Sequence, residues 1–230
     1  MNVCVIPARG GSKRIPLKNI RDFCGQPMMA WSIQAAQQAG CFDRIIVSTD
    51  HNQIATLACE LGAEAPFQRP PHLADDHTTT QAVIVHAIDQ LKSQGLNVDQ
   101  VCCLYATAPL VQADDLRAGA LLLERCTPET FVFSATRFPY PIQRAIRIDG
   151  HGRSSMFNPE HANTRSQDLE EAFHDAGQFY WARVQAWEGY NDIFSGGLPL
   201  LVPQWRVQDI DTEDDWKRAE LLHRLLNNLL

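Results

Sequence analysis

A short apolar run at the start of the chain leads directly into a glycine-rich, basic loop. The run is Val3–Ile6, and the loop carries four cations: Arg9, Lys13, Arg14 and Lys18. Gly10 and Gly11 can adopt backbone conformations closed to other residues, so their N–H groups can turn inward and hold an anion. A strand that ends in such a loop is how an α/β protein builds a phosphate pocket. Because the net charge is -7, this local cluster indicates an anionic small ligand.

The composition narrows the class of protein further. With 230 residues, 45% hydrophobic and 20% charged, the chain fits one soluble globular domain spanning 1–230. The acidic balance argues against a nucleic-acid partner, and no apolar run is long enough to span a bilayer. Met1 and Asn2 lead straight into the first strand, which leaves no room for a signal peptide. Seven cysteines without a C-x-x-C pair predict reduced thiols and a cytoplasmic protein.

Strand and helix patterns alternate along most of the chain. Strands are predicted at 3–7, 44–48, 65–67, 101–105, 130–136 and 178–183, and helices at 28–39, 52–61, about 80–92, 114–125 and after 212 to about 226. Asn52, Asp114 and Thr212 are expected to cap the helices that begin beside them. The series predicts a mostly parallel sheet covered by helices on both faces. Ligands should bind beyond the carboxyl ends of its strands, at the loops 8–19, 49–50 and 106–109 and around 209–211.

The alternation breaks over 137–175. This segment is rich in Pro, Arg, Asn and His, and it is long for a loop inside one compact domain. We interpret it as an inserted, β-rich arm or flap.

Two carboxylates, Asp209 and Asp211, lie two residues apart at the end of an extended run, so alternation points both to the same side. Hard oxygen ligands of this kind suit Mg²⁺, which often bridges a protein to phosphates. The alternative is that Asp209 or Asp211 only caps the last helix. The acidic pairs at 75–76, 114–115 and 170–171 are expected to be caps or solvated faces.

The first loop does not match the G-x-G-x-x-G fingerprint or the Walker-type phosphate loop. It closely resembles the signature of the acylneuraminate cytidylyltransferases, which reads here as IPARGGSKRIPLKN over 6–19. Further blocks resemble the same family: FDRIIVSTD over 42–50, Arg69-Pro70 with LADD over 73–76, and DIDT over 209–212. The resemblance implies a Rossmann-like nucleotidyltransferase fold of the nucleotide-diphospho-sugar transferase type, with an inserted dimerisation arm.

Other blocks resemble the branch of this family that acts on pseudaminic acid, a bacterial nine-carbon sugar acid. They are Arg14, YATAP over 105–109, FPYPIQRA over 138–145, RSQDL over 165–169 and HDAGQFYW over 174–181. The implied reaction joins CMP from CTP to the sugar acid, releases pyrophosphate and feeds flagellin or surface glycans. The alternatives are the same reaction on N-acetylneuraminate or legionaminate, or a non-catalytic nucleotide-binding protein on the same fold. A Kdo cytidylyltransferase fits less well, because that family's loop lacks the paired glycines.

The resemblance also implies roles for individual residues. The expected CTP site comprises Arg9, Gly10, Gly11, Ser12, Lys13, Lys18, Asn19, Arg69 and Thr80. The expected sugar site comprises Tyr105, Gln143, Arg144, Arg165, Gln178 and Tyr180. Arg9, Lys18 and Asp211 are expected to be catalytic, with Mg²⁺ on Asp209 and Asp211. Arg165 matches a family arginine supplied by the partner subunit, which implies an obligate homodimer with an isologous interface.

Overall fold

A six-stranded sheet forms the centre of the computed structural model, which describes residues 1–190 and 192–228. The strands lie in the order β10 (Leu198–Leu201), β6 (Val132–Arg137), β9 (Phe173–Arg183), β5 (Gln100–Leu104), β1 (Asn2–Pro7) and β4 (Arg44–Ser48). β9 runs antiparallel to both of its neighbours, and the other three strand pairs are parallel. The predicted mostly parallel sheet is therefore confirmed. Since β9 is reversed, its first residues lie at the edge where β5 and β6 end.

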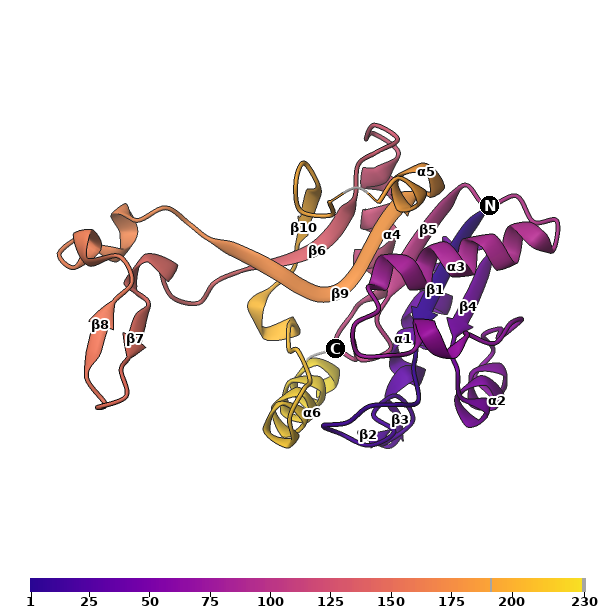
Figure 1. The fold of residues 1–230 in the computed structure, drawn as a ribbon, viewed down its shortest axis with the longest axis horizontal. Helices are drawn as coiled ribbons and strands as arrows, with labels where there is room; N and C mark the ends of the chain where they lie inside the picture. The colour runs from indigo at the N-terminus through magenta and orange to yellow at the C-terminus, as the bar shows by residue number, and fades with distance from the viewer. Residues whose placement is uncertain (191, 229–230) are drawn as a thin grey trace.

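Helices cover both faces of this sheet (Figure 1). One face packs against α1 (Met28–Ala39), α2 (Asn52–Glu60) and α4 (Ala113–Leu123), and the other against α3 (Thr80–Ser93) and α5 (Val184–Glu188). Trp181 is fully buried in the first core, and Trp187 in the second. Burial of large apolar side chains stabilises such cores by about 1.5–3 kcal/mol each.

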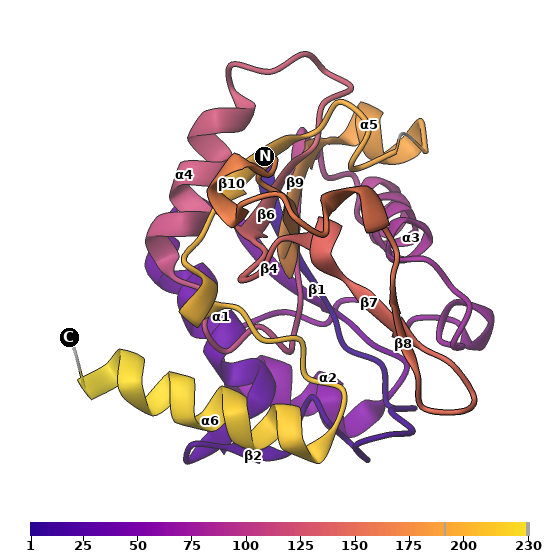
Figure 2. The ribbon, with the colours of Figure 1, turned by 90° about the vertical axis from the view of Figure 1, so that its left-hand side faces the viewer.

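A third, smaller core holds the basic loop in place. The side chain of Ile15 is buried with Phe23 and with Trp216 of α6 (Glu213–Asn228). Phe23 belongs to a small hairpin of β2 (Asp22–Phe23) and β3 (Gln26–Pro27), and its ring meets Trp216 edge-on at 5.4 Å. Figure 2 shows α6 lying beside β2. The loop is thus anchored in its middle by a hydrophobic side chain.

The helix starts agree with the sequence in part. Thr212 caps α6 as predicted: its Oγ1 accepts from Asp215 N at 3.2 Å, while an Asp215 carboxylate oxygen accepts from Thr212 N at 2.9 Å. The caps predicted at Asn52 and Asp114 are wrong. Both residues are already helical, and Asp114 instead pairs with Arg117 one turn along α4.

The strand predicted at 65–67 is also wrong. The residues on either side of it, Glu64 and Gln68, form isolated bridges to Ile46 and Thr49, and Phe67 packs against the core without joining a strand. In the described part of the chain, no helix combines the length and the apolar character that a membrane crossing needs. Two short 3-10 helices, η1 (Pro71–Leu73) and η5 (Gln204–Arg206), lie in the connections around the site.

The segment 137–175 forms a projecting arm between β6 and β9. At its far end β7 (Ile146–Ile148) pairs with β8 (Ser154–Met156), and the 3-10 helices η2 (Ile142–Arg144), η3 (Pro159–His161) and η4 (Ser166–Asp168) lie in its connections. Figure 1 shows this arm extending well away from the sheet. Apolar side chains on it are open to solvent, with Ile146 56% exposed and Ile148 69% exposed. The far end of the arm therefore lacks a hydrophobic core of its own that would fix its direction.

Candidate active site

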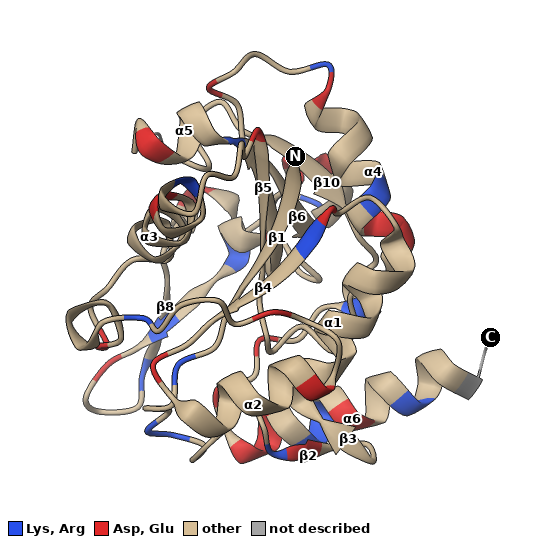
Figure 3. Ribbon diagram, turned by 90° about the vertical axis from the view of Figure 1, so that its right-hand side faces the viewer, with Lys and Arg blue, Asp and Glu red and all other residues tan. Residues whose placement is uncertain are grey.

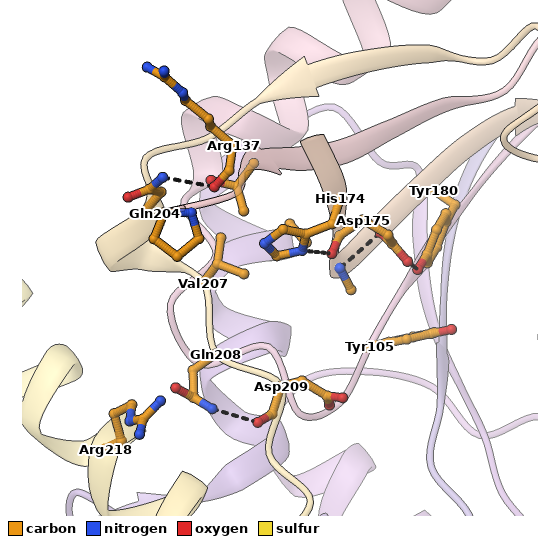
Figure 4. A pocket seen from close by; sticks show the side chains of 14 residues that line it. Tyr105, Arg137, His174, Asp175, Tyr180, Gln204, Val207, Gln208, Asp209 and Arg218 are labelled. Carbon is orange, nitrogen blue, oxygen red and sulfur yellow. Dashed lines mark hydrogen bonds between the residues drawn. The ribbon is translucent and has the colours of Figure 1, made fainter. Parts of the chain in front are cut away.

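Two pockets open at the edge of the sheet where β1, β4 and β5 end, and Tyr105 lines both. The loop pocket, of about 340 Å³, is lined among others by Arg9, Ser12, Lys18, Asn19, Arg69 and Thr80. The strand pocket, of about 550 Å³, is lined among others by His174, Asp175, Tyr180, Gln208, Asp209 and Arg218 (Figure 4). The structure therefore brings most of the residues expected at a nucleotide site into one pocket, with a second pocket beside it.

Two cations of the basic loop share one carboxylate, that of Asp76. Arg9 Nη1 lies 2.7 Å from Asp76 Oδ1, and Lys13 Nζ lies 2.5 Å from Asp76 Oδ2. These hydrogen bonds from Lys13 and Arg9 hold the pKa of Asp76 below its usual value. The sequence analysis expected Asp76 to be a helix cap or part of a solvated face. That expectation is wrong, because Asp76 lines the loop pocket and pairs with two of its cations.

The other two cations of the loop share Asp211. Arg14 Nη1 lies 3.0 Å from Asp211 Oδ2, and Lys18 Nζ lies 3.6 Å from Asp211 Oδ1. Lys18 also donates to the carbonyl of Ile210 at 2.5 Å, which ties the loop to the segment before α6. The Asp211 carboxylate and the basic loop are therefore in contact, although they lie near opposite ends of the sequence.

Neither of the paired glycines adopts an unusual backbone angle, and only Gly10 is needed because a neighbouring side chain lies close to it. Neither has a positive φ, and the left-handed residue of the loop is Leu17, with φ 50°. A Cβ added to Gly10 would lie 2.7 Å from the ring of His51, whereas one added to Gly11 would meet nothing within 4 Å. The Gly10 N–H donates to Asp50 Oδ1 at 2.9 Å, so it faces Asp50 and not the pocket. The expected conformational role of the two glycines is therefore wrong, and Gly10 serves a close approach instead.

Buried polar side chains form the floor of the loop pocket. Asn19, 6% exposed, donates from Nδ2 to the Arg9 carbonyl at 2.9 Å. Arg69, 4% exposed, donates from Nε to Ser48 Oγ at 3.2 Å, and burial lowers the pKa of this guanidinium to about 10. Each group keeps further polar atoms for a ligand, because only part of its hydrogen-bonding capacity is used.

The strand pocket is organised around Asp175. Its Oδ1 accepts from Gly177 N at 2.9 Å, and its Oδ2 accepts from the Tyr180 hydroxyl. The register of β6 against β9 shifts here, and Ser134 Oγ takes up the N–H groups of Gln178 and Phe179 at 3.2 Å each. Such a bulge redirects side chains, which explains how Asp175 comes to face the pocket.

Tyr105 lines both pockets, and Tyr180 lies beside it in the strand pocket. Their ring centroids lie 5.5 Å apart, and the Tyr105 hydroxyl lies 3.0 Å from Thr80 Oγ1. Burial raises the pKa of Tyr105 to about 12 and raises that of Tyr180 strongly. Both hydroxyls therefore stay protonated near neutral pH, where they can donate hydrogen bonds.

The residues present fit a magnesium ion on Asp209 and Asp211. The Asp209 carboxylate opens onto the strand pocket, and it receives no hydrogen bond from the described residues. Loss of surrounding water and the neighbouring charge of Asp211 raise its pKa. A cation would offset both effects. Within the described residues, no group of three or more His, Cys, Asp or Glu side chains could hold a metal alone, so phosphate or water oxygens would supply the remaining ligands.

Four of the residues expected at the sugar site lie elsewhere in this chain. Gln178 is buried and donates to the Arg206 carbonyl at 2.5 Å. In the arm, Gln143 donates to the Glu170 carbonyl at 3.0 Å and Arg144 to that of Thr164, while Arg165 is exposed at the start of η4. Of the expected sugar residues, only Tyr105 and Tyr180 line the strand pocket.

Sequence reasoning placed Asp50 in a candidate ligand loop but gave it no role, and it did not single out Asp76 or Asp175 as site residues. One signal for Asp76 was available, since four cations close together in a chain of net charge -7 require nearby anions. Asp175 is placed by the bulge in β9, which no spacing in the sequence reveals. Figure 3 shows acidic and basic segments interspersed over the viewed side, without one broad basic face.

Comparisons with known proteins agree with this geometry. A family model described as Cytidylyltransferase matches residues 3–183. The chain is 44% identical over 225 residues to a pseudaminic acid cytidylyltransferase of Campylobacter jejuni, covering 97% of each protein. It is 32% identical over 231 residues to a CMP-N,N'-diacetyllegionaminic acid synthase of Legionella pneumophila, covering 97% of this chain and 96% of that protein.

The fold also has solved counterparts. A CMP:2-keto-3-deoxy-manno-octonic acid synthetase complexed with CTP superposes with a TM-score of 0.69 at 16% identity, over 100% of this chain and 99% of the other. At 16% sequence identity, this similarity shows a shared fold and carries no conclusion about function. Taken with the family model and the full-length relatives, the loop and its pocket show that the chain belongs to the cytidylyltransferase family.

Proposed function

We propose that this protein transfers CMP from CTP to pseudaminic acid, giving CMP-pseudaminate and pyrophosphate. The observation that carries the proposal is the meeting of two pockets at Tyr105, one lined by Arg9, Lys18 and Arg69, the other lined by hydrogen-bonding side chains. A transfer between two substrates needs such adjoining sites. The 44% identity to a pseudaminic acid cytidylyltransferase along the whole chain supports the choice of sugar.

CTP is assigned to the loop pocket. Its triphosphate would lie on Arg9, Ser12, Lys13 and Lys18 with the Gly11 backbone, and its cytidine against Asn19, Arg69 and Thr80, while Gly10 lets the loop approach His51 closely. The anchored loop supports this assignment, because Ile15 and the Lys18 contact to Ile210 fix the cations before a ligand arrives. Fixed cations stabilise developing charge without the cost of reorganisation.

The reaction is an in-line displacement at the α-phosphorus. The anomeric C2 hydroxyl forms the new O–P bond and loses its proton to water, the α–β phosphoanhydride bond breaks, and pyrophosphate leaves with the electron pair. Arg9 and Lys18 would hold the phosphates in line, while Asp211 keeps Lys18 aimed into the loop pocket. Mg²⁺, when bound on Asp209 and Asp211, would neutralise charge on the phosphates. The protein contributes mainly positioning and electrostatic stabilisation.

The sugar acid is assigned to the strand pocket, with Tyr105 and Tyr180 as its walls. Gln143, Arg144 and Arg165 lie on the projecting arm of the same chain, so we propose that the arm of a second copy completes this pocket. The exposed apolar side chains of the arm support a homodimer, since a symmetric contact would bury them twice. Gln178, held on the Arg206 carbonyl, would support the pocket from behind.

We further propose that the enzyme acts in the cytoplasm and supplies the glycosylation of flagellin or surface glycans. All seven cysteines are free thiols, which suits a reducing compartment.

The test is pyrophosphate release from CTP and Mg²⁺ with a panel of pseudaminate, legionaminate and N-acetylneuraminate. We expect the fastest turnover with pseudaminate. Release with none of the three would sink the enzyme assignment. Turnover of neuraminate or legionaminate without pseudaminate would leave the transferase intact and remove the sugar assignment alone.

A further inference from the structure

We propose that Asp76 is a specificity-determining residue that competes with the ligand's phosphates for Arg9 and Lys13. Only a ligand with several negative charges, such as a nucleoside triphosphate or pyrophosphate, would displace it. The inference rests on the assignment of the triphosphate to the loop pocket. It adds a residue that discriminates among phosphate ligands and hastens the release of pyrophosphate.

The contacts of Asp76 place its carboxylate on two of the cations assigned to the triphosphate. Each carboxylate oxygen meets one cation, Oδ1 with Arg9 at 2.7 Å and Oδ2 with Lys13 at 2.5 Å. Arg9 Nη1 also donates to the Asp75 carbonyl at 2.7 Å. A phosphate oxygen that takes up the same N–H groups must replace these acceptors, because each N–H proton serves one good acceptor at a time.

The backbone holds Asp76 in this place independently of the cations. Asp75 Oδ1 accepts from His77 N at 2.9 Å, from Thr78 N at 2.7 Å and from Thr78 Oγ1 at 2.7 Å. Immediately afterwards Thr79 caps α3, with Ala82 N donating to its Oγ1 at 3.2 Å. The turn therefore fixes where the Asp76 backbone lies, and a displaced carboxylate can return only to the same two cations.

The exposure of the three side chains makes the exchange feasible. Arg9 is 33% exposed, Asp76 37% and Lys13 79%, so water screens both ion pairs. Pairs of this kind contribute little to stability and yield to a stronger anion. A displaced Asp76 would remain beside the terminal phosphates and repel them. Ligands that carry only the phosphate next to the nucleoside would leave both ion pairs intact.

The experiment measures binding rather than turnover. Calorimetry gives the Kd of Mg²⁺-pyrophosphate, CTP and CMP for the wild type and for Asp76→Asn, which keeps the size of the side chain and removes its charge. We expect pyrophosphate and CTP to bind about 3- to 10-fold more tightly to the variant, with CMP unchanged, since one or two screened pairs are lost. The gain should shrink at high salt. Asp114→Asn, which removes a charge from an exposed pair with Arg117, is the matched control and should change nothing.

The outcomes separate this inference from the function on which it rests. A wild type that binds neither CTP nor pyrophosphate overturns both. Binding by the wild type with an unchanged Kd in the folded Asp76→Asn variant overturns the competition alone. Weaker pyrophosphate binding in the variant, seen only with Mg²⁺, would make Asp76 a metal ligand and also overturns it. In a Lys13→Gln background the Asp76→Asn gain should be smaller, because one contested cation is gone.

Discussion

The basic loop and the projecting arm differ in how firmly the rest of the chain holds them in place. The loop is held at many points inside one chain: Ile15 is buried under α6, Gly10 is pressed against His51, and Lys18 reaches the segment before α6. The arm makes contacts mainly with itself, and it exposes Ile146 and Ile148 to solvent. The difference fits the proposal that the nucleotide half of the site is built within one chain, whereas the arm of a second copy completes the sugar half.

The largest expected effect is at Asp211, the carboxylate that links the loop to the proposed metal site. Asp211→Ala should lower kcat about 10²–10³-fold, because it frees Arg14 and Lys18 and removes a proposed metal ligand. The thermal midpoint should stay near that of the wild type, since the Asp211 side chain is 33% exposed and its ion pairs are screened by water. Asp214→Ala, on an exposed residue of the first turn of α6, is the matched control and should keep full activity. Near-normal turnover of Asp211→Ala would remove it from the site.

A second, smaller effect is expected at the paired glycines. Gly10→Ala would push against His51 and shift the loop, and a displacement of that kind should lower kcat/KM about 10–100-fold. Gly11→Ala meets open space and should change kcat/KM by no more than about 2-fold. Steady-state kinetics with CTP distinguishes the two. Equal losses in both variants would mean that the loop is not held by close packing.

The smallest effect is expected in the stability of the core that carries the loop. His223, 4% exposed, packs against Trp31 at 4.1 Å and Phe23 at 5.4 Å, and burial lowers its pKa. The unfolded chain therefore binds the proton more readily. Stability is full above the unfolded pKa of about 6.5 and falls as the pH drops from there toward the lower folded value.

Thermal midpoints measured from about pH 7.5 to about pH 5.5 should fall more steeply in the wild type than in His223→Gln. If the thermal midpoints of the two proteins fall in parallel with pH, protonation of His223 does not contribute to the pH dependence of stability. Nucleotide protection of the midpoint should weaken over the same range, because the same core seats the loop.

Much of the loop half could be predicted from the sequence because its signals are local. The strand at the start, the cluster of cations and the cap at Thr212 are short patterns with a direct physical interpretation, whereas the role of Gly10 beside His51 depends on a contact that only the fold creates. The pairing of Arg9 and Lys13 with Asp76 was missed, because residues sixty positions apart meet only once the sheet has formed. The same holds for Asp175, whose direction is set by a bulge between β6 and β9.

The arm shows the other limit of such reasoning. Its position could be predicted from the broken alternation after β6, yet its direction could not, because few of its side chains pack against the rest of the chain. Gln143 and Arg144 illustrate the point. Both were expected at the sugar, and within one chain both hold the arm's own carbonyl groups. The contacts of the arm with a second copy would involve its exposed surface, and the pattern of a single sequence does not show which surface that is.

The division of the site between two chains can be measured in hybrid dimers. Subunits with Arg165→Ala and subunits with Asp211→Ala are co-expressed with different tags, and the dimer that carries both tags is purified. One of its two sites would combine an intact loop with the intact arm of the other chain, so the hybrid should recover about half of wild-type turnover while each parent stays nearly inactive. A hybrid as inactive as its parents would contradict the account, because each site would then draw its loop and its arginine from the same chain.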